Sequence, residues 1–136
     1  MNMLMEGADA RDSQISNLRA LTSALESLRH QTGETEWTMA QILILSALGI
    51  KGELAQAEVT ALTQLSGSAV SRILFDQLGE NAPKGLRLLT VRNDPDDRRR
   101  KIIGLTKAGK EAVEALVSPI QRKLTNVPSA NTAIKR

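Results

Sequence analysis

The chain has 136 residues, of which 41% are apolar and 24% are charged, so it is expected to form one folded domain around one core. It contains no cysteine, which excludes a disulfide framework and a thiolate metal site, and it has no apolar run of about 18 residues that would predict a transmembrane helix. The formal net charge of +3 is unevenly divided: residues 1–60 carry four basic and eight acidic side chains (net −4), whereas residues 61–136 carry fourteen and seven (net +7). The second half is therefore where an anionic partner is expected to bind. The lack of cysteine and of a long apolar run favours a cytoplasmic protein with no membrane association.

Two helices are expected in the acidic half of the chain. Apolar residues recur every three or four positions from about Ser13 to Gln31, which is typical of an amphipathic helix, and the stripe is Ile15, Leu18, Leu21, Leu25 and Leu28. Residues 1–12 precede this stripe and are expected to be a flexible lead. Thr38 and Gln41 then have the spacing of a capping box. The apolar run behind them predicts a second helix that is buried on most sides, with Met39, Ile42, Leu43, Leu45 and Leu48.

Two short helices with a tight break between them follow. The first is marked by Val59 and Leu62, and the second by Val70, Ile73, Leu74 and Leu78. The intervening "TQLSGS" has Ser66 in position to cap the second helix. A break of this length is typical of a helix-turn-helix, although other helical hairpins have similar turns. The second helix would present Gly67, Ser68, Ser71 and Arg72 away from its apolar stripe, either as a surface that reads DNA or as a plain solvated face.

A β-hairpin and a last helix complete the expected order. The stretches "GLRLLTVRN" and "RRKIIGLT" are β-prone runs on either side of the turn "DPDD", which predicts a hairpin. Thr106 is positioned to cap a helix over residues 106–124, whose apolar stripe is Val113, Leu116, Val117, Ile120 and Leu124. Pro119 lies inside this helix and is expected to kink it or restart it near Val117. Residues 125–136 are polar and are expected to be a flexible tail, so the fold class is mainly α with a small β-hairpin.

Two segments resemble the MarR family of winged helix-turn-helix regulators. "DPDDRRRKIIGLTKAG", from Asp94 to Gly109, is similar to that family's wing and the start of its C-terminal helix, with matches at Asp94, Pro95, Asp97, Arg98, Arg99, Leu105, Thr106 and Gly109. "LSGSAVSRIL", from Leu65 to Leu74, resembles the turn and the recognition helix. Together with the helix order, the resemblance covers residues 13–124. It implies a winged helix-turn-helix domain with dimerisation helices over 13–31 and 106–124, although the link "GENAPKGLRLL" is longer than the family's usual Gly-Leu step.

The resemblance implies a sequence-specific regulator of transcription, a repressor, that binds double-stranded DNA. The recognition helix would enter the major groove with Ser66, Gly67, Ser68, Ser71 and Arg72. In the wing, Asp97 would brace the turn, Arg99 would enter the minor groove, and Arg98, Arg100 and Lys101 would lie on or near phosphates. Strand alternation is expected to point Arg98 and Arg100 to one side and Arg99 and Lys101 to the other. A salt-bridged surface turn is the alternative interpretation.

A homodimer is also expected. The apolar stripes within residues 15–28 and 113–124 exceed what a core of this size absorbs, so we expect these residues to form a two-fold interface; the alternative is that both helices complete a monomeric core. No cofactor is expected. By resemblance, a small and often phenolic ligand would release the DNA by entering the cleft between the dimerisation helices and the DNA-binding lobe, and the sequence leaves open whether this chain has such an effector.

Other functions have less support from the residues. Asp94, Asp96 and Asp97 could hold a divalent cation, but four cations follow them directly and no further acidic ligand accompanies them, so no metal site is expected. His30 is the single histidine and lies at a helix end without catalytic partners, so we do not expect an enzyme. Trp37 and Phe75 are expected to be packing residues, and Phe75 could brace the wing. Two alternatives to a regulator stay open: an architectural DNA-binding protein, as in partition or replication control of a mobile element, and a winged-helix module that binds an acidic protein.

Overall fold

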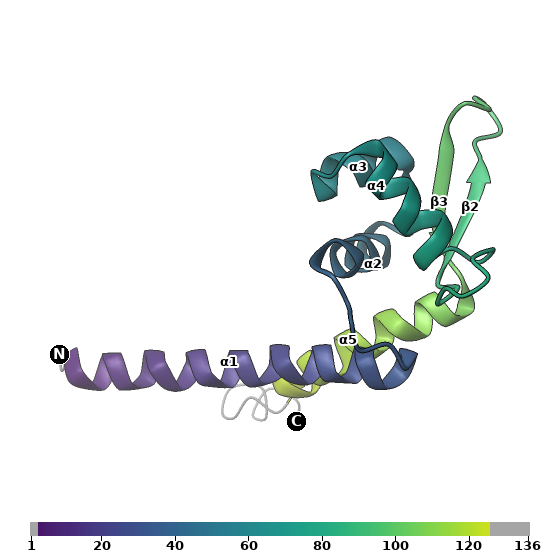
Figure 1. Cartoon of the computed structure of the whole chain (residues 1–136). Coiled ribbons are helices and arrows are strands. Elements are labelled where there is room, and N and C mark those ends of the chain that lie inside the picture. Colours follow the sequence, from purple (N-terminus) through teal and green to yellow (C-terminus); the bar gives the residue numbers. More distant parts are fainter. Residues whose placement is uncertain (1–2, 126–136) are drawn as a thin grey trace, which may run out of the picture.

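The computed structural model describes residues 3–125, which form a helical domain with one small sheet (Figure 1). Its elements, in chain order, are α1 (Met3–Thr32), α2 (Met39–Lys51), β1 (Leu54–Ala55), α3 (Gln56–Thr63), α4 (Gly67–Arg72), the π-helical segment η1 (Ile73–Gln77), β2 (Leu89–Asn93), β3 (Lys101–Leu105) and α5 (Lys107–Thr125). The expected C-terminal tail lies outside the described residues except for Thr125, which ends α5. The mainly α fold class with a hairpin is confirmed.

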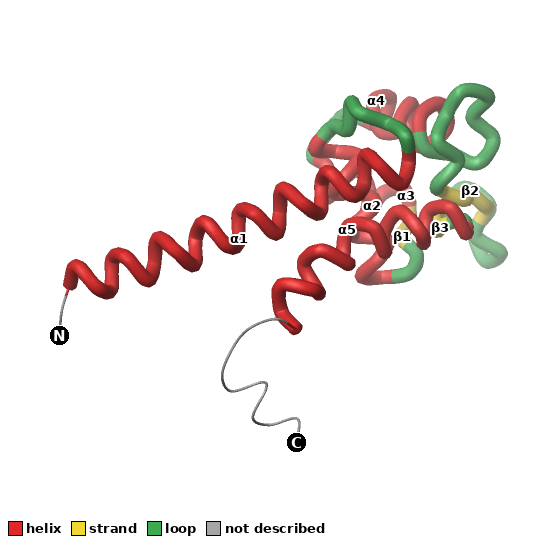
Figure 2. Tube along the Cα trace, turned by 90° about the horizontal axis from the view of Figure 1, so that it is seen from below, coloured by secondary structure: helices red, strands yellow, loops and turns green. Residues whose placement is uncertain are grey.

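The helix α1 is longer than the sequence pattern indicated. It begins at Met3, so residues 3–12, expected as a flexible lead, are helical. The apolar stripe marks only the part of a helix that can pack, whereas nothing before Ser13 stops a helix once it is nucleated. Gly7 is the one weak helix former in this extension, and its surroundings are open. α1 packs along α5, and in Figures 1 and 2 both helices project away from the lobe that contains α3, α4 and the hairpin.

The capping box of α2 is confirmed. The backbone N–H of Gln41 donates to Thr38 Oγ1 at 3.2 Å, and the backbone N–H of Thr38 donates to Gln41 Oε1 at 2.9 Å. The expectation that this helix is buried on most sides is wrong, because Met39 is 77% exposed and Leu43 is exposed as well. The buried face consists of Gln41, Ile44, Leu45 and Leu48. This spacing is one stripe of a helix, and Met39 and Leu43 lie outside it.

The hairpin of β2 and β3 forms with a third strand that the sequence pattern did not indicate. β2 pairs antiparallel with β3 from Leu89 opposite Leu105 to Asn93 opposite Lys101. β1 pairs with the other edge of β3, which gives the strand order β1-β3-β2. Two residues are too few to show a β period, so β1 is recognisable only through its partner strand. Its pairing joins the start of α3 to the hairpin.

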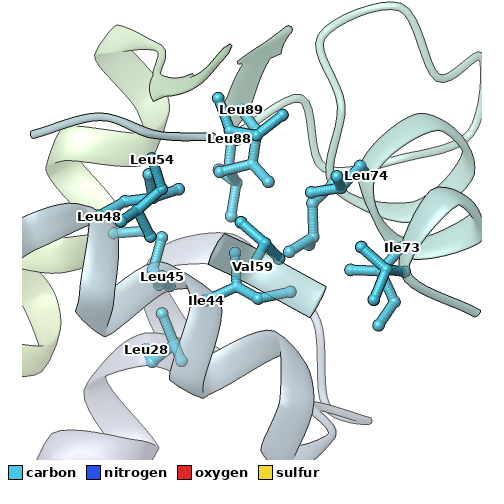
Figure 3. Close-up of a cluster of buried hydrophobic side chains, with 14 residues drawn as sticks. Leu28, Ile44, Leu45, Leu48, Leu54, Val59, Ile73, Leu74, Leu88 and Leu89 are labelled. Carbon is cyan, nitrogen blue, oxygen red and sulfur yellow. The ribbon is translucent and has the colours of Figure 1, made fainter. Parts of the chain in front are cut away.

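The core is aliphatic and is contributed by every helix (Figure 3). Leu28 of α1, Ile44 and Leu45 of α2, Val59 of α3 and Leu74 of η1 are all essentially inaccessible to solvent. Each fully buried side chain of this size contributes about 1.5–3 kcal/mol of hydrophobic stabilisation. The core therefore holds the helix-turn-helix against α2 and the sheet, and fixes where its outer face lies.

The helix α5 starts and continues in ways that the sequence predicted only in part. Thr106 caps it as expected, since the backbone N–H of Gly109 donates to Thr106 Oγ1 at 3.0 Å. The expected restart near Val117 does not occur, because the helix is continuous from Lys107 to Thr125 with Pro119 inside it. A proline removes one helical hydrogen bond. Here Pro119 is buried, and packing along α1 keeps the two halves of α5 in one helix.

Candidate nucleic-acid interface

The turn between α3 and α4 is built by local hydrogen bonds. α3 ends at Gln64, which adopts the left-handed conformation with φ 58° and ψ 25° and donates its N–H to the carbonyl of Thr60. Two residues later Ser66 begins α4, and its hydroxyl accepts the N–H of Ala69 at 3.1 Å. The predicted cap and the short break of a helix-turn-helix are thus both present, and the N-terminus of α4 is held at the protein surface.

Most of the residues that were predicted to read DNA lie on the face of α4 that points away from the core. Ser66, Gly67, Ser68 and Arg72 are exposed, while Val70 is completely buried. Ser71 differs, because it is half-buried and its hydroxyl accepts a 3.3 Å hydrogen bond from the side-chain amide of Gln56 on α3. The outer face of α4 is therefore a short polar surface with one cation and little side-chain bulk, a form suited to close approach by a polyanion.

The turn of the hairpin is folded by two aspartates. Asp97 Oδ1 accepts the backbone N–H of Arg99 at 3.0 Å, and the Asp97 carbonyl accepts the N–H of Arg100 at 2.9 Å. Asp94 Oδ1 accepts the backbone N–H of Asp96 at 2.9 Å. That backbone hydrogen bond is the main reason why the pKa of Asp94 lies below its ordinary value; partial burial opposes the shift and Arg100 adds to it. Both carboxylates stabilise the turn by accepting backbone N–H groups two residues ahead of them.

The four consecutive cations of the wing have different environments. The side chain of Arg99 is 95% exposed, and its nearest carboxylate oxygen, on Asp97, is 3.6 Å from Nε. Arg98 is exposed and forms no ion pair within residues 3–125. Arg100 instead pairs with Asp94 at 3.1 Å, and Lys101 Nζ donates to Asn93 Oδ1 at 2.6 Å. The expected alternation along these residues does not apply, because β3 begins only at Lys101 and the three arginines lie in the turn.

Three residues near the wing were missed by the sequence reasoning. Arg92 on β2 donates from Nη2 to both carboxylate oxygens of Glu53, at 3.0 and 2.9 Å. Glu58 on α3 lies 3.8 Å from Arg100 and also accepts the N–H of Ala55 at 2.9 Å. The capping-box spacing of Glu58 could have identified its local role. Its position beside the wing follows from the pairing of β1 with β3, which has no signal in the sequence.

Phe75 lies in η1, on the side that faces the hairpin. It is partly exposed and lines a cleft of about 230 Å³ together with Val91, Asn93 and Lys101. This position agrees with a packing residue that braces the wing. Asp76 and Glu80 are exposed next to it, and their negative charge would limit the surface available to an anionic partner at this end of the helix.

The predicted dimerisation stripes divide into a buried and an exposed part. Leu28 belongs to the core, Val113 and Leu116 pack against it, and Leu25 is half-buried. The remaining large apolar residues are exposed, from 37% at Ile15 to 52% at Leu18 and 58% at Leu124; the others are Leu21, Val117 and Ile120. They lie in the middle of α1 and in the C-terminal half of α5. The monomer core thus covers two residues of each five-residue stripe and leaves three uncovered.

Metal binding, catalysis by histidine and membrane insertion are the other functions that residues 3–125 could support. No group of three or more histidine and acidic side chains there is arranged to hold a metal ion. His30 is exposed in the last turn of α1. Among these residues no helix combines the length and apolar character needed to cross a membrane.

Comparisons with known proteins identify the fold. Neither the protein-family models nor the curated proteins include a match to this sequence. Among solved structures, the transcriptional regulator Tm0710 from Thermotoga maritima is 22% identical over 95% of this chain and 86% of that chain, with a TM-score of 0.63. The MarR family transcription regulator SP03579 is 18% identical over 98% and 82%, with a TM-score of 0.56. The regulator PcaV from Streptomyces coelicolor, solved with its natural ligand, is 24% identical over 95% and 84%, with a TM-score of 0.53. The chain therefore has the winged helix-turn-helix fold of the MarR-family transcriptional regulators.

Proposed function

We propose that this protein is a transcriptional regulator, a repressor, that binds double-stranded DNA as a homodimer. The observation that carries the proposal is the pair of exposed arginines at the wing tip, Arg98 without an ion pair within residues 3–125 and Arg99 with its side chain 95% exposed, beside a recognition helix with a polar, sterically open N-terminus. α4 and the hairpin tip both lie on the side of the domain remote from α1 (Figure 1). One duplex can therefore be contacted by both without interference from the projecting helices.

Each element of this surface suits a different groove. The N-terminus of α4 offers free backbone N–H groups, two serine hydroxyls and Arg72, which can bind phosphates or guanine in the major groove. Arg99 extends from a turn that is narrow and fixed by Asp97, a shape that fits the more negative potential of a narrow minor groove. Arg98 would contact flanking phosphates. Arg100 and Lys101, already bound to Asp94 and Asn93, would contribute less than the sequence suggested.

Dimerisation would follow from the uncovered halves of α1 and α5. A second copy packed on the exposed residues between Ile15 and Leu21 and between Val117 and Leu124 would remove a continuous apolar surface from water. Two recognition helices related by a two-fold axis would then read half-sites about 34–36 Å apart. This geometry predicts an inverted repeat as the preferred operator.

A ligand that releases DNA is part of the proposal. Two clefts lie between the projecting helices and the DNA-binding lobe: one of about 180 Å³ is lined by Leu25, Arg29 and Trp37, and one of about 470 Å³ lies between α2, the sheet and α5 and includes Lys110. Small-molecule sites usually have volumes of about 300–1,000 Å³. The larger cleft is therefore the better candidate in this chain, and its lining, which includes Glu53 and Lys110 beside Leu48, Leu105 and Val113, suits a ligand with polar as well as apolar parts.

Selection from a random-duplex library tests the function. The purified protein is incubated with the library, the bound DNA is amplified over several rounds, and the enriched duplex is titrated against salt. We expect one inverted repeat, with log K falling against log salt by about 0.9 per neutralised phosphate. Enrichment of DNA without a motif would support an architectural DNA-binding protein instead. Absence of duplex binding at moderate salt would reject both and favour a protein partner for the wing.

The oligomeric state is tested by light scattering coupled to size exclusion. Leu18→Glu places a charge in the middle of the proposed interface, and we expect it to convert a dimer to a monomer. Ile50→Glu is the matched control, because Ile50 is exposed on α2 outside these stripes. A wild-type monomer, or a Leu18→Glu variant that remains a dimer, would exclude this interface.

A further inference from the structure

The hairpin is tied to the first helix of the helix-turn-helix by side chains as well as by the sheet. Arg100, at the end of the turn, forms an ion pair with Asp94 at 3.1 Å inside the wing and another with Glu58 at 3.8 Å on α3. Arg92, lower on the hairpin, pairs with Glu53 at 2.9 Å. These five residues surround a cleft of about 210 Å³ between the wing and the start of α3. The hairpin is thus attached by side chains at two points, to α3 through Glu58 and to the segment before β1 through Glu53.

The carboxylate of Glu58 is itself fixed in place. Its Oε1 accepts the backbone N–H of Ala55 at 2.9 Å, which holds the side chain at the N-terminus of α3. Negative charge is favourable at that end of a helix. Arg100 therefore has a partner that is anchored to the helix-turn-helix, and the orientation of the wing tip is coupled to the position of α3.

Stability alone does not account for this arrangement. Arg100 and Glu58 have half-exposed side chains, and exposed ion pairs add little to the free energy of unfolding. Arg100 also gives up much of its value as a DNA contact, because its guanidinium is compensated by two carboxylates. Beyond Asn93 and Lys101 the two arms of the hairpin are still joined by the Asp94 N–H, which donates to the Arg100 carbonyl at 2.8 Å, but the pairing of β1 with β3 stops at Ile102. The direction of the tip relative to α3 therefore depends on side-chain contacts such as this one.

We propose that Glu58 and Arg100 are positioning residues that fix the wing tip relative to the recognition helix, so that Arg99 and the N-terminus of α4 engage neighbouring grooves together. This inference rests on the proposed function of the wing in DNA binding. It assigns a positive role in binding a polyanion to an acidic residue, Glu58. It therefore predicts that removing the charge of Glu58 weakens DNA binding, whereas simple charge repulsion predicts that it strengthens binding.

Glu58→Gln is the informative variant. The glutamine keeps a side-chain oxygen for the Ala55 N–H but loses the charge that attracts Arg100. Removing a negative charge near bound DNA should tighten binding if Glu58 acts only through the overall field. We expect the reverse for the selected operator: binding weaker by about 1.5- to 5-fold per half-site, the worth of one exposed ion pair, and by about 2- to 25-fold for a dimer. Binding to random duplex should stay equal or become tighter.

Glu80→Gln is the matched control, since Glu80 is an exposed acid beside the recognition helix and forms no ion pair within residues 3–125. It should leave operator binding equal or tighter. Arg100→Gln and the double variant with Glu58→Gln complete a double-mutant cycle, in which the second change should add little to the first. Operator binding by Glu58→Gln that equals or exceeds wild type would overturn the proposal.

Amide hydrogen exchange of the full-length protein without DNA supplies a readout that does not depend on the function. The N–H groups of Arg99 and Arg100 are bonded inside the turn, and we expect them to exchange faster in Glu58→Gln than in wild type, with no change in Glu80→Gln. Unchanged exchange would show that Glu58 does not hold the wing. Wild-type protein that binds no duplex would reject the proposed function, and faster exchange in Glu58→Gln would then still establish the contact with the wing.

Discussion

Replacing Arg99 by alanine removes the most exposed cation of the wing. Its side chain is 95% exposed, and its single ion pair within residues 3–125 is with Asp97, 3.6 Å from Nε. An ion pair this exposed contributes about 0–1 kcal/mol to folding. We therefore expect Arg99→Ala to fold normally, with a melting temperature within about 4 °C of wild type.

The effect on DNA binding should be much larger. Loss of a base-reading arginine costs about 1–3 kcal/mol, and a value near 1.4 kcal/mol is a tenfold loss of affinity per half-site. A homodimer uses Arg99 twice, so the affinity for the full operator should fall by about a hundredfold. The slope of log K against log salt should also become shallower by about 0.9 for each lost cation contact.

Fluorescence anisotropy with the selected operator at several salt concentrations measures both quantities, and circular dichroism measures the melting temperature. Arg122→Ala is the matched control, because Arg122 lies in the last turn of α5 and bonds only to Ser118 among the described residues. It removes the same charge from a region remote from the wing. Equal losses of affinity in the two variants would show that net charge, and not insertion of Arg99, drives binding.

Three further predictions concern stability and pH. Leu45→Ala empties a fully buried core position and should lower the free energy of unfolding by about 2–5 kcal/mol in urea titration; a smaller loss would mean that the core relaxes into the space. Gly109→Ala would put a methyl group against the carbonyl oxygen of Leu88, only 2.1 Å from an ideal Cβ. We expect the free energy of unfolding to fall by about 1–3 kcal/mol in the same assay. Wild-type stability would mean that α5 can shift. The Asp96 N–H lowers the pKa of Asp94 in the folded state. The carboxylate of Asp94 therefore contributes to folding stability above its unfolded pKa of about 3.9, and this contribution is lost as pH falls through the lower folded pKa. A titration midpoint of the Asp94 carboxyl at or above about 3.9 by NMR would contradict this.

Several features of the candidate interface follow from local rules that act within a few residues. The caps formed by Thr38, Ser66 and Thr106 were predictable, because each hydroxyl accepts an N–H only three residues ahead of it. The hairpin was predictable for a similar reason, since its two strands are separated by a short turn with Asp and Pro. Asp97 also acts within its own turn, so its contact with the Arg99 N–H agrees with the bracing expected from the wing motif.

The parts that were missed or wrong depend on residues far apart in the chain. β1 is a strand only because β3 lies beside it, and Glu58 comes within 3.8 Å of Arg100 because that pairing brings α3 to the wing. The exposure of Met39 has the same origin, since an apolar run shows that a helix can be buried but not which of its faces meets a neighbour. Local hydrogen bonding and apolar periodicity depend on residues a few positions apart in the sequence, so the sequence alone predicts the helices, the turn and the hairpin. Within the hairpin, Asp94, Asn93 and Asp97 already pair with Arg100, Lys101 and Arg99, whereas the tertiary structure alone decides that Glu58 and Glu53 reach Arg100 and Arg92. The physical reason is that an arginine side chain is long enough to reach either solvent or a carboxylate that only the folded chain places beside it.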